Sequence, residues 1–240
     1  MNASNEVIYY WMPNDGSLDN NNINNPIATP KRTTTYTVYG IDNNGCKDSA
    51  VFPQVMCPYT NQCPPLVTYT QGGWGSIPSG NNPGSYLQAN FGPATNNNFS
   101  IGFKNKLTFN NPVSVQKFLP SGGKPTVLPN GVLLNPLNYS NTFAGQLVAA
   151  KLNMTFDYYD VNFAAPTKNL GDMYCNFAPF LGMTVKQVIY EADMKIGGGY
   201  SQFTITDLVT ALDFINLNYD NGTVDNGDLI CDDPLNQRII

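Results

Sequence analysis

The first residues whose type and spacing could do chemistry are the carboxylates of a short loop near the C-terminus. Asp220, Asp225 and Asp228 lie within nine residues, separated mostly by asparagine and glycine. Calcium prefers oxygen ligands of this kind, so the loop is a candidate calcium site, and calcium is the one cofactor that the residues suggest. The glutamate that closes an EF-hand loop is missing, and the acidic residues are spaced differently from the ligands of an EF-hand. An ordinary Asn-Gly turn is the alternative.

Three other carboxylates could be combined into an acid/base pair for glycoside hydrolysis. Asp157 and Asp160 lie about one helical turn apart, and nothing in the sequence links Glu191 to them. The chain contains no histidine, which excludes Ser-His-Asp and Cys-His catalysis and any histidine-ligated metal. We therefore expect a protein without a catalytic centre.

Aromatic residues near one glycine-rich run offer a different chemistry. Tyr69 directly precedes the run Thr70–Gly75 and Trp74 lies within it, and an exposed ring there could stack on a sugar. Core packing is the alternative for Trp74, because aromatic side chains dominate the energy of burial.

Composition narrows the class of protein. The 240 residues carry a net charge of −5, and no run of lysine or arginine that nucleic-acid binding would need. No apolar stretch approaches the roughly 20 residues of a membrane span. The chain contains 33 asparagines and 2 glutamates. Such a surface suits a β-rich extracellular protein, although an AT-rich codon bias would produce the same composition.

The elements that must position these residues fall into two modules. Residues 1–57 alternate Thr, Tyr and Val between Asn-Gly turns, which predicts an all-β module. Prolines and cysteines mark residues 58–68 as a linker. Residues 69–230 predict an α+β module that is strand-rich first and helical later, and residues 231–240 form a tail. The predicted strands of the second module are 99–103, 106–109 and 113–119.

Three helices are predicted in the second half of that module. The first, 143–157, is capped by Thr142 and carries an apolar stripe at spacings of three and four, with Lys151 pointing outward. The second opens with the capping box Thr184–Gln187 and ends at the glycines that start at Gly197. The third is capped by Thr206.

Two runs carry a resemblance to a known module. The chain resembles a module of secreted and surface proteins of bacteria and archaea at these two runs. The first run is Thr70-Gln71-Gly72-Gly73-Trp74-Gly75, and the second is Gly145-Gln146-Leu147-Val148-Ala149-Ala150-Lys151-Leu152-Asn153. That module has no established chemistry. The resemblance implies an extracellular or cell-surface location.

The first 57 residues resemble the second half of an immunoglobulin-like repeat, of the PKD-like and gliding-adhesin type found in Bacteroidota surface proteins. The resemblance rests on Trp-x-Pro, Thr-Thr-Thr-Tyr-Thr-Val and Asn-Gly-Cys. It implies a partial sandwich whose missing strands come from upstream repeats of the same polypeptide or from another subunit. It also implies that Cys46 is the unpaired one of five cysteines. The other four are then disulfide candidates: Cys57, Cys63, Cys175 and Cys231.

Together these patterns predict an α+β protein with a partial immunoglobulin-like N-terminal module. The expected function is that of a non-catalytic, extracellular structural or adhesive module, which assembles with other surface-protein subunits through strand addition. The alternative is a carbohydrate-binding module of a secreted hydrolase, with glycans as partners and Trp74 as the exposed ring.

Overall fold

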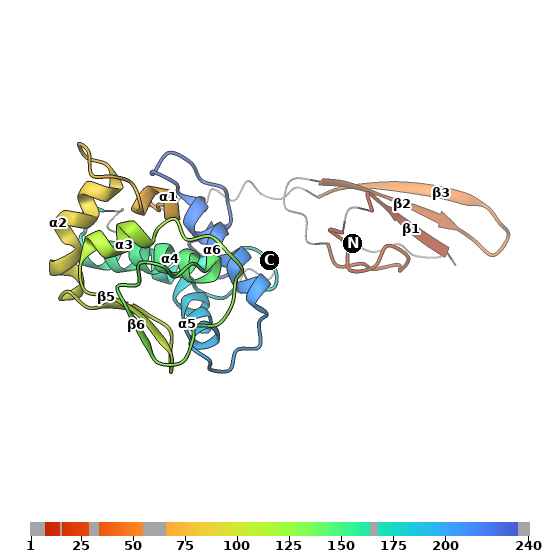
Figure 1. The fold of residues 1–240 in the computed structure, drawn as a ribbon. Coiled ribbons are helices and arrows are strands. Elements are labelled where there is room, and N and C mark those ends of the chain that lie inside the picture. Colours follow the sequence, from red (N-terminus) through yellow and green to blue (C-terminus); the bar gives the residue numbers. More distant parts are fainter. Residues whose placement is uncertain (1–7, 15, 29–33, 55–65, 164–167, 235–240) are drawn as a thin grey trace. The chain divides into compact units, whose positions relative to one another are not determined.

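The computed structural model describes residues 8–14, 16–28, 34–54, 66–163 and 168–234 (Figure 1). The chain divides into two compact units, Met1–Thr60 and Asn61–Ile240, which are described separately below. The boundary falls inside the segment 58–68 that was predicted as a linker. However, Leu66 and Thr68 are buried in the second unit, so the linker does not extend as far as residue 68.

The first unit is built on one antiparallel sheet of order β1–β2–β3. Its strands are Ile8–Met12 (β1), Thr34–Ile41 (β2) and Lys47–Gln54 (β3), and the alternation predicted an all-β module here. Asp42 closes the β2–β3 hairpin, because its Oδ1 accepts the backbone N–H groups of Asn44 and Cys46, both at 2.8 Å.

One face of this sheet is covered by the loop between β1 and β2. Trp11, Tyr36 and Val38 are buried together with Leu18 of the loop. The indole Nε1 of Trp11 donates to the carbonyl oxygen of Ile23 at 2.8 Å, which ties the loop to the sheet. The first unit therefore has a small hydrophobic core of its own on that face.

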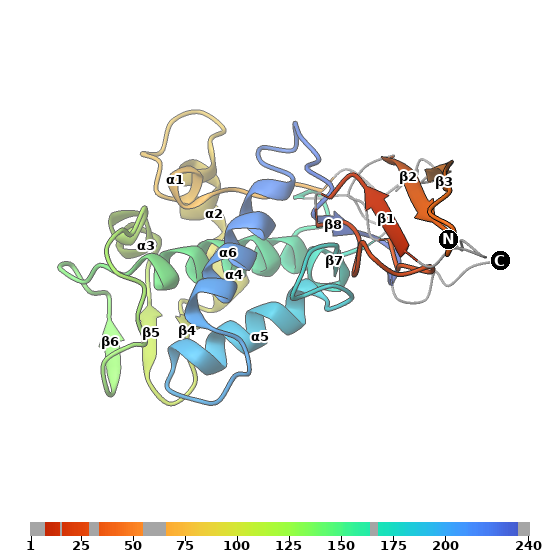
Figure 2. The same cartoon turned by 90° about the vertical axis from the view of Figure 1, so that its right-hand side faces the viewer.

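The second unit mixes helices with short strands, which confirms the α+β class (Figures 1 and 2). Strands β4 and β5 are antiparallel, β5 and β6 are parallel, and β7 pairs with β8. The helices are Gln71–Trp74 (α1), Pro83–Thr95 (α2), Pro112–Phe118 (α3), Thr142–Tyr159 (α4), Val185–Ile196 (α5), Ile205–Asn218 (α6) and a 3-10 turn, Leu170–Asp172 (η1). The strands are Phe99–Ile101 (β4), Lys106–Phe109 (β5), Val132–Leu134 (β6), Tyr174–Cys175 (β7) and Leu229–Ile230 (β8).

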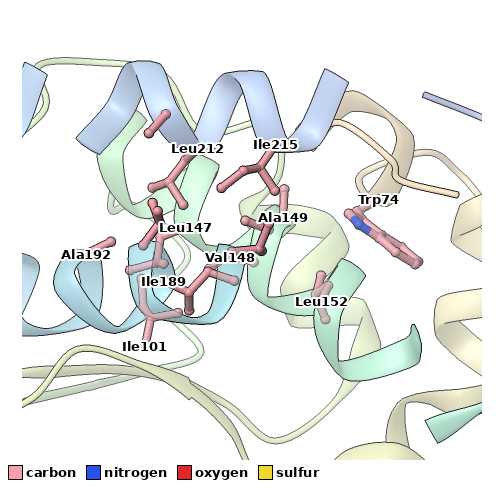
Figure 3. Packing of buried hydrophobic residues seen from close by; sticks show 14 of the residues in the cluster. Trp74, Ile101, Leu147, Val148, Ala149, Leu152, Ile189, Ala192, Leu212 and Ile215 are labelled. Atoms are coloured by element: carbon pink, nitrogen blue, oxygen red, sulfur yellow. The ribbon is translucent and has the colours of Figure 1, made fainter. Parts of the chain in front are cut away.

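Helix α4 lies at the centre of this unit. It packs against α1, α2, α5 and α6, so it is apolar around most of its circumference. Leu147 (Figure 3) is fully buried, and so is Ala150, as the spacing predicts. Asn141, rather than Thr142, caps the helix, because its Oδ1 accepts the N–H groups of Phe143 (3.0 Å) and Ala144 (3.3 Å).

Several predicted boundaries are wrong for local reasons. The predicted strand 113–119 is wrong, because its residues up to Phe118 belong to helix α3: Asn111 caps this helix and Pro112 occupies its first turn. The alternation of Val113 and Val115 is typical of a strand and therefore predicted one. Helix α6 is capped by Thr204, through a capping box with Asp207, and not by Thr206. The capping box at Thr184 and the end of α5 at Gly197 are confirmed.

Candidate functional site

Asn153, near the end of α4, is fully buried and joins three segments of the chain. Its Oδ1 accepts the backbone N–H of Tyr69 (2.9 Å) and the indole Nε1–H of Trp74 (3.0 Å). Its Nδ2 donates to the carbonyl oxygen of Tyr69 and to Oδ1 of Asn216, both at 3.0 Å. A side-chain amide offers two donors and two acceptor positions, so the capacity of Asn153 is used completely.

The network continues from Asn216 of α6 back to α4. The Nδ2 of Asn216 donates to the backbone oxygen (3.1 Å) and to Oε1 (2.8 Å) of Gln146, whose Nε2 donates to Asp213 at 2.8 Å. Thr68 completes the arrangement, since its Oγ1 donates to the carbonyl oxygen of Asn216 (2.9 Å) and accepts the N–H of Tyr219 (3.1 Å). The entering chain, α4 and α6 are thus held by one buried polar network.

Gly145 and Gln71 lie close together, which brings the two motif runs, 70–75 and 145–153, into contact. The Oε1 of Gln71 accepts the backbone N–H of Ser121 at 2.9 Å. A Cβ atom at position 145 would lie 2.0 Å from that oxygen and 2.9 Å from Cβ of Ser121, so a larger residue there would displace the Gln71 amide from its hydrogen bond. The runs 70–75 and 145–153 therefore lie against each other, and these polar side chains make internal hydrogen bonds.

Trp74 is not a surface ring. Its side chain has no solvent exposure and belongs to the hydrophobic core (Figure 3). It packs edge to face against Tyr69, with 5.1 Å between ring centroids, and in a tilted arrangement against Phe156, with 5.2 Å between centroids. The role of Trp74 in stacking on a sugar is therefore wrong, because a buried ring presents no face to a ligand. Tyr69 is partly buried against the same core.

Lys151 does not simply point into solvent, as the sequence predicted. Its Nζ forms an ion pair with Oδ2 of Asp193 on α5, and about a quarter of the lysine side chain is exposed. The other oxygen of Asp193 accepts the backbone N–H of Gly102 at 2.7 Å. The pair therefore links α4, α5 and the β4–β5 hairpin.

The carboxylates considered for catalysis serve separate structural roles. Asp157 is buried, and its Oδ2 accepts the backbone N–H of Leu170 at 2.7 Å. Burial raises the pKa of Asp157, this hydrogen bond opposes the rise, and the charge of Asp172 adds to it. Asp160 binds the hydroxyl of Tyr86 at 2.9 Å instead.

The surroundings of Asp160 shift its pKa in the direction opposite to that of Asp157. The backbone N–H of Asn162 and then the Tyr86 hydroxyl lower the pKa of Asp160. Glu191 lies on α5. A carboxylate pair that shares one substrate would need both groups directed at a common point, and Asp157 and Asp160 bind different partners.

The acidic loop is organised by a buried asparagine. The Oδ1 of Asn218 accepts the backbone N–H groups of Asp228 (2.8 Å) and Leu229 (3.2 Å), and its Nδ2 donates to Asp225 at 3.3 Å. Asp220 lies in a bridge with Thr68. In the described parts of the chain, no three Asp, Glu, Cys or His side chains gather in a way that could hold a metal ion. Calcium binding by this loop stays a prediction.

The cysteines differ from the expected pattern at one position. Cys46 is exposed and free, as predicted, and Cys231 is disulfide-bonded. Cys175 is a free thiol with no solvent exposure, so its assignment to a disulfide is wrong. Burial raises the pKa of the Cys175 thiol to about 12, and the charge of Asp228 adds to this. Cys57 and Cys63 lie outside the described residues.

The second face of the N-terminal sheet is apolar and exposed. Cross-strand partners point to the same face, and the register defines three rows of three side chains. We call this set the apolar face: Ile8, Ile41 and Lys47; Tyr10, Tyr39 and Ser49; Met12, Thr37 and Val51.

Exposure of the apolar face is high. Five of its large apolar side chains are between 41% and 62% exposed, whereas Trp11 on the covered face is fully buried. Contiguous apolar surface of this kind marks interaction sites more often than chance. The apolar face is therefore the strongest candidate interaction surface in the first unit.

The asparagines at 153, 216 and 218 are the residues that sequence reasoning missed. The abundance of asparagine in the composition suggests a role for it at the surface. A signal existed for Asn153, because it follows the buried Ala149 at a spacing of four on a helix that is apolar on most sides. Its partners, however, come from segments 63 and 84 positions away.

Searches of family models, curated proteins and solved structures find no match to this chain. Among the residues that the structure describes, no helix is both long and apolar enough to cross a membrane.

Proposed function

We propose that the chain is a non-catalytic structural or adhesive module of a secreted or cell-surface bacterial protein. One observation carries the proposal: polar side chains of the two motif runs are engaged inside the protein. Gln71, Gln146 and Asn153 all bind neighbouring segments, so these groups position the fold and not a substrate.

The first unit supplies the interaction role in this proposal. Its sheet has one face covered by its own loop and one apolar face exposed. An immunoglobulin-like sandwich consists of two sheets that bury such faces against each other. A single sheet with an uncovered face is consistent with half of a sandwich whose other half belongs to a partner. The carbohydrate-binding alternative loses Trp74, the residue on which it depended.

Activity and location test the proposal together. The purified full chain, incubated with chromogenic glycosides, esters and peptides, is expected to show no turnover above the buffer control. On intact cells of the source organism, added protease should remove the protein from the surface fraction. Turnover that disappears in Asp157→Asn would contradict the proposal, and so would protein that resists protease until the cells are lysed.

A further inference from the structure

The chain contains four Asn-Gly sequences, and each lies at the surface of its unit. They are Asn44-Gly45, Asn130-Gly131, Asn221-Gly222 and Asn226-Gly227, and all of these residues are exposed. Asparagine followed by glycine is prone to lose its side-chain amide spontaneously, because the glycine nitrogen carries no bulky neighbour. We propose that Asn44, at the tip of the β2–β3 hairpin, is the site at which this protein deamidates, and that the fold protects the other three.

The reaction at Asn44 needs only water. The backbone nitrogen of Gly45 gives its proton to solvent base and bonds to Cγ of Asn44, while the Cγ–Nδ2 bond breaks and Nδ2 leaves as ammonia after taking a proton from water. Water then opens the cyclic imide at either carbonyl, which yields aspartate or isoaspartate. No electron is transferred, and one negative charge is added to the net charge of −5, because a neutral amide becomes a carboxylate.

In all four sequences the glycine N–H already donates a hydrogen bond, so the reaction waits until that bond opens. The acceptors are the carbonyl oxygen of Asp42 for Gly45 (3.0 Å), Oδ1 of Asn105 for Gly131 (3.0 Å), the carbonyl oxygen of Tyr219 for Gly222 (2.8 Å) and Oδ1 of Asp225 for Gly227 (2.9 Å). The four sequences therefore differ in how easily the surrounding backbone opens.

The sequences at Asn130 and Asn221 are held by distant segments. The carbonyl oxygen of Gly131 accepts the N–H of Lys106 at 2.9 Å, which adds to the bond from Asn105. The N–H of Asn221 donates to the carbonyl oxygen of Thr68 at 3.0 Å. Opening either sequence thus separates segments that the fold packs together.

The sequence at Asn226 is held on both sides of the bond that would react. The Nδ2 of Asn226, which is the leaving group, donates to the carbonyl oxygen of Leu217 at 2.9 Å. The carbonyl oxygen of Gly227 accepts Nδ2 of Asn176 at 3.2 Å. These bonds restrain the side chain and the main chain that would have to close into a ring.

The turn at Asn44 is held only by its own residues. The Oδ1 of Asp42 accepts the N–H groups of Asn44 and Cys46, both at 2.8 Å, and the N–H of Asp42 donates to the carbonyl oxygen of Cys46 at 3.0 Å. Nothing lies within 4 Å of a Cβ built at position 45, so the approach to the nitrogen of Gly45 is open. Opening the tip of an exposed hairpin costs less free energy than separating packed segments.

The expected difference in rate follows from the additional bonds. One hydrogen bond contributes about 1 kcal/mol net. If that bond has to open before the reaction, the barrier rises by the same amount and the rate falls about fivefold. Asn44 should therefore convert at least about fivefold faster than each of the other three in the folded protein.

Conversion at Asn44 alters the first unit locally. Isoaspartate adds one carbon to the main chain, so the N–H groups that Asp42 binds lose their spacing. The turn closes at the pair Ile41–Lys47, which belongs to the apolar face. Deamidation thus changes the charge and the main-chain length at one end of that face.

Prolonged incubation of the purified full chain tests this inference. The protein is kept for several weeks at mildly alkaline pH, in buffer and in parallel in concentrated urea. Isoelectric focusing measures the fraction that has gained a negative charge, and peptide mass mapping assigns aspartate and isoaspartate to positions. In buffer, Asn44 should convert first. In urea the four rates should approach one another, because no sequence is then held by the fold.

Asn44→Gln removes the site, because the longer side chain would have to close a larger ring. This variant should not accumulate the acidic form in buffer. Asn43→Gln is the matched control, since Asn43 is the neighbouring exposed asparagine and is followed by asparagine instead of glycine. It should acidify like the wild type.

A pair of variants at Asn105 tests the protection of Asn130. Asn105→Ala removes the acceptor of the Gly131 N–H, so the rate at Asn130 should rise about fivefold. Asn105→Asp keeps an acceptor oxygen and should leave that rate close to the wild-type value. Circular dichroism of both variants should match the wild-type spectrum.

Four outcomes would overturn the inference. They are conversion at another Asn-Gly sequence as fast as at Asn44 in buffer, an unchanged Asn44 in buffer while the urea sample converts, acidification of Asn44→Gln at the wild-type rate, and equal rates at Asn130 in the two Asn105 variants. None of them bears on the proposed function, because the reaction needs neither a partner nor an enzyme. Turnover in the substrate screen would contradict the proposed function alone.

Discussion

The side-chain oxygen of Asn153 lies 3.0 Å from the indole nitrogen of Trp74, and both residues have no solvent exposure. This bond joins the two motif runs, which are 79 positions apart in the chain. A buried indole N–H needs an acceptor, and Asn153 supplies it while it also binds the backbone of Tyr69.

Asn153→Ala should therefore be strongly destabilising. It leaves the N–H of Trp74 and the backbone groups of Tyr69 without their partners in the core. An unsatisfied buried group costs about 1–3 kcal/mol, so we expect a loss of about 3–5 kcal/mol in urea unfolding. Asn138→Ala, at an exposed asparagine, should change stability by less than about 0.5 kcal/mol. Equal effects of the two changes would contradict a structural role for Asn153.

Gly197→Ala should destabilise the second unit for a steric reason. A Cβ at position 197 would lie 2.0 Å from the backbone nitrogen of Phe103, and backbone cannot move aside as a flexible side chain can. We expect a loss of about 1–3 kcal/mol or more by thermal unfolding. Gly122→Ala is the control, because nothing lies within 4 Å of a Cβ at position 122. A neutral Gly197→Ala would show that the hairpin does not contact α5 as described.

The Lys151–Asp193 ion pair should contribute only modestly to the free energy of unfolding. A double-mutant cycle with Lys151→Met and Asp193→Asn should give a coupling energy of about 0.5–1 kcal/mol, because the pair is partly exposed. Asp193→Ala should cost more than Lys151→Met, since it also removes the acceptor of the Gly102 N–H. No measurable coupling would indicate that the two groups are solvated separately.

Asp157 should make stability depend on pH in a defined direction. Burial raises its folded-state pKa above the ordinary value of an aspartate. The folded protein then binds more protons than the unfolded chain, so this group's contribution to stability falls as the pH rises through the folded-state pKa. Asp157→Asn keeps an oxygen for the Leu170 N–H and removes the charge.

The variant Asp157→Asn should consequently be more stable than the wild type at pH 7. The difference should shrink as the pH approaches the unfolded pKa of about 3.9. Urea midpoints measured at intervals between these limits would show it. A difference that stays constant with pH would mean that Asp157 does not titrate in this range.

Cys46 and Cys175 should react at very different rates. At pH 8 a thiol with a pKa of about 12 is almost entirely protonated, and that of Cys175 is also shielded from solvent. Iodoacetamide should therefore label Cys46 in the native protein and Cys175 only after unfolding, as peptide mass mapping would show. Rapid native labelling of Cys175 would contradict its burial.

Local patterns predicted the parts of the fold that depend on neighbours in sequence. The spacing of Leu147 and Ala150 located α4, and Thr184 with Gln187 located the start of α5. Helix α3 is ambiguous in the sequence, because the alternating Val113 and Val115 fit a strand as well as a short helix. The Asn111 cap and Pro112 are the local features that favour the helix.

The candidate site could not be predicted in the same way. The bond between Asn153 and Trp74 depends on how α4 packs against the chain entering the second unit, and no local pattern encodes that distance. Likewise, Lys151 has no opposite charge on its own helix face. Its partner Asp193 lies on α5, 42 positions away.

The bridge at Thr68 has a mechanical consequence. Its N–H donates to the carbonyl oxygen of Tyr219 and its carbonyl oxygen accepts the N–H of Asn221, both at 3.0 Å, in a parallel bridge to Asp220. When the chain is pulled from before Thr68 and from after Asn221, the two paired segments are drawn in opposite directions along their length. Both bonds then bear the force in shear at the same time, so tension applied between the segment before Thr68 and the segment after Asn221 has to break them together.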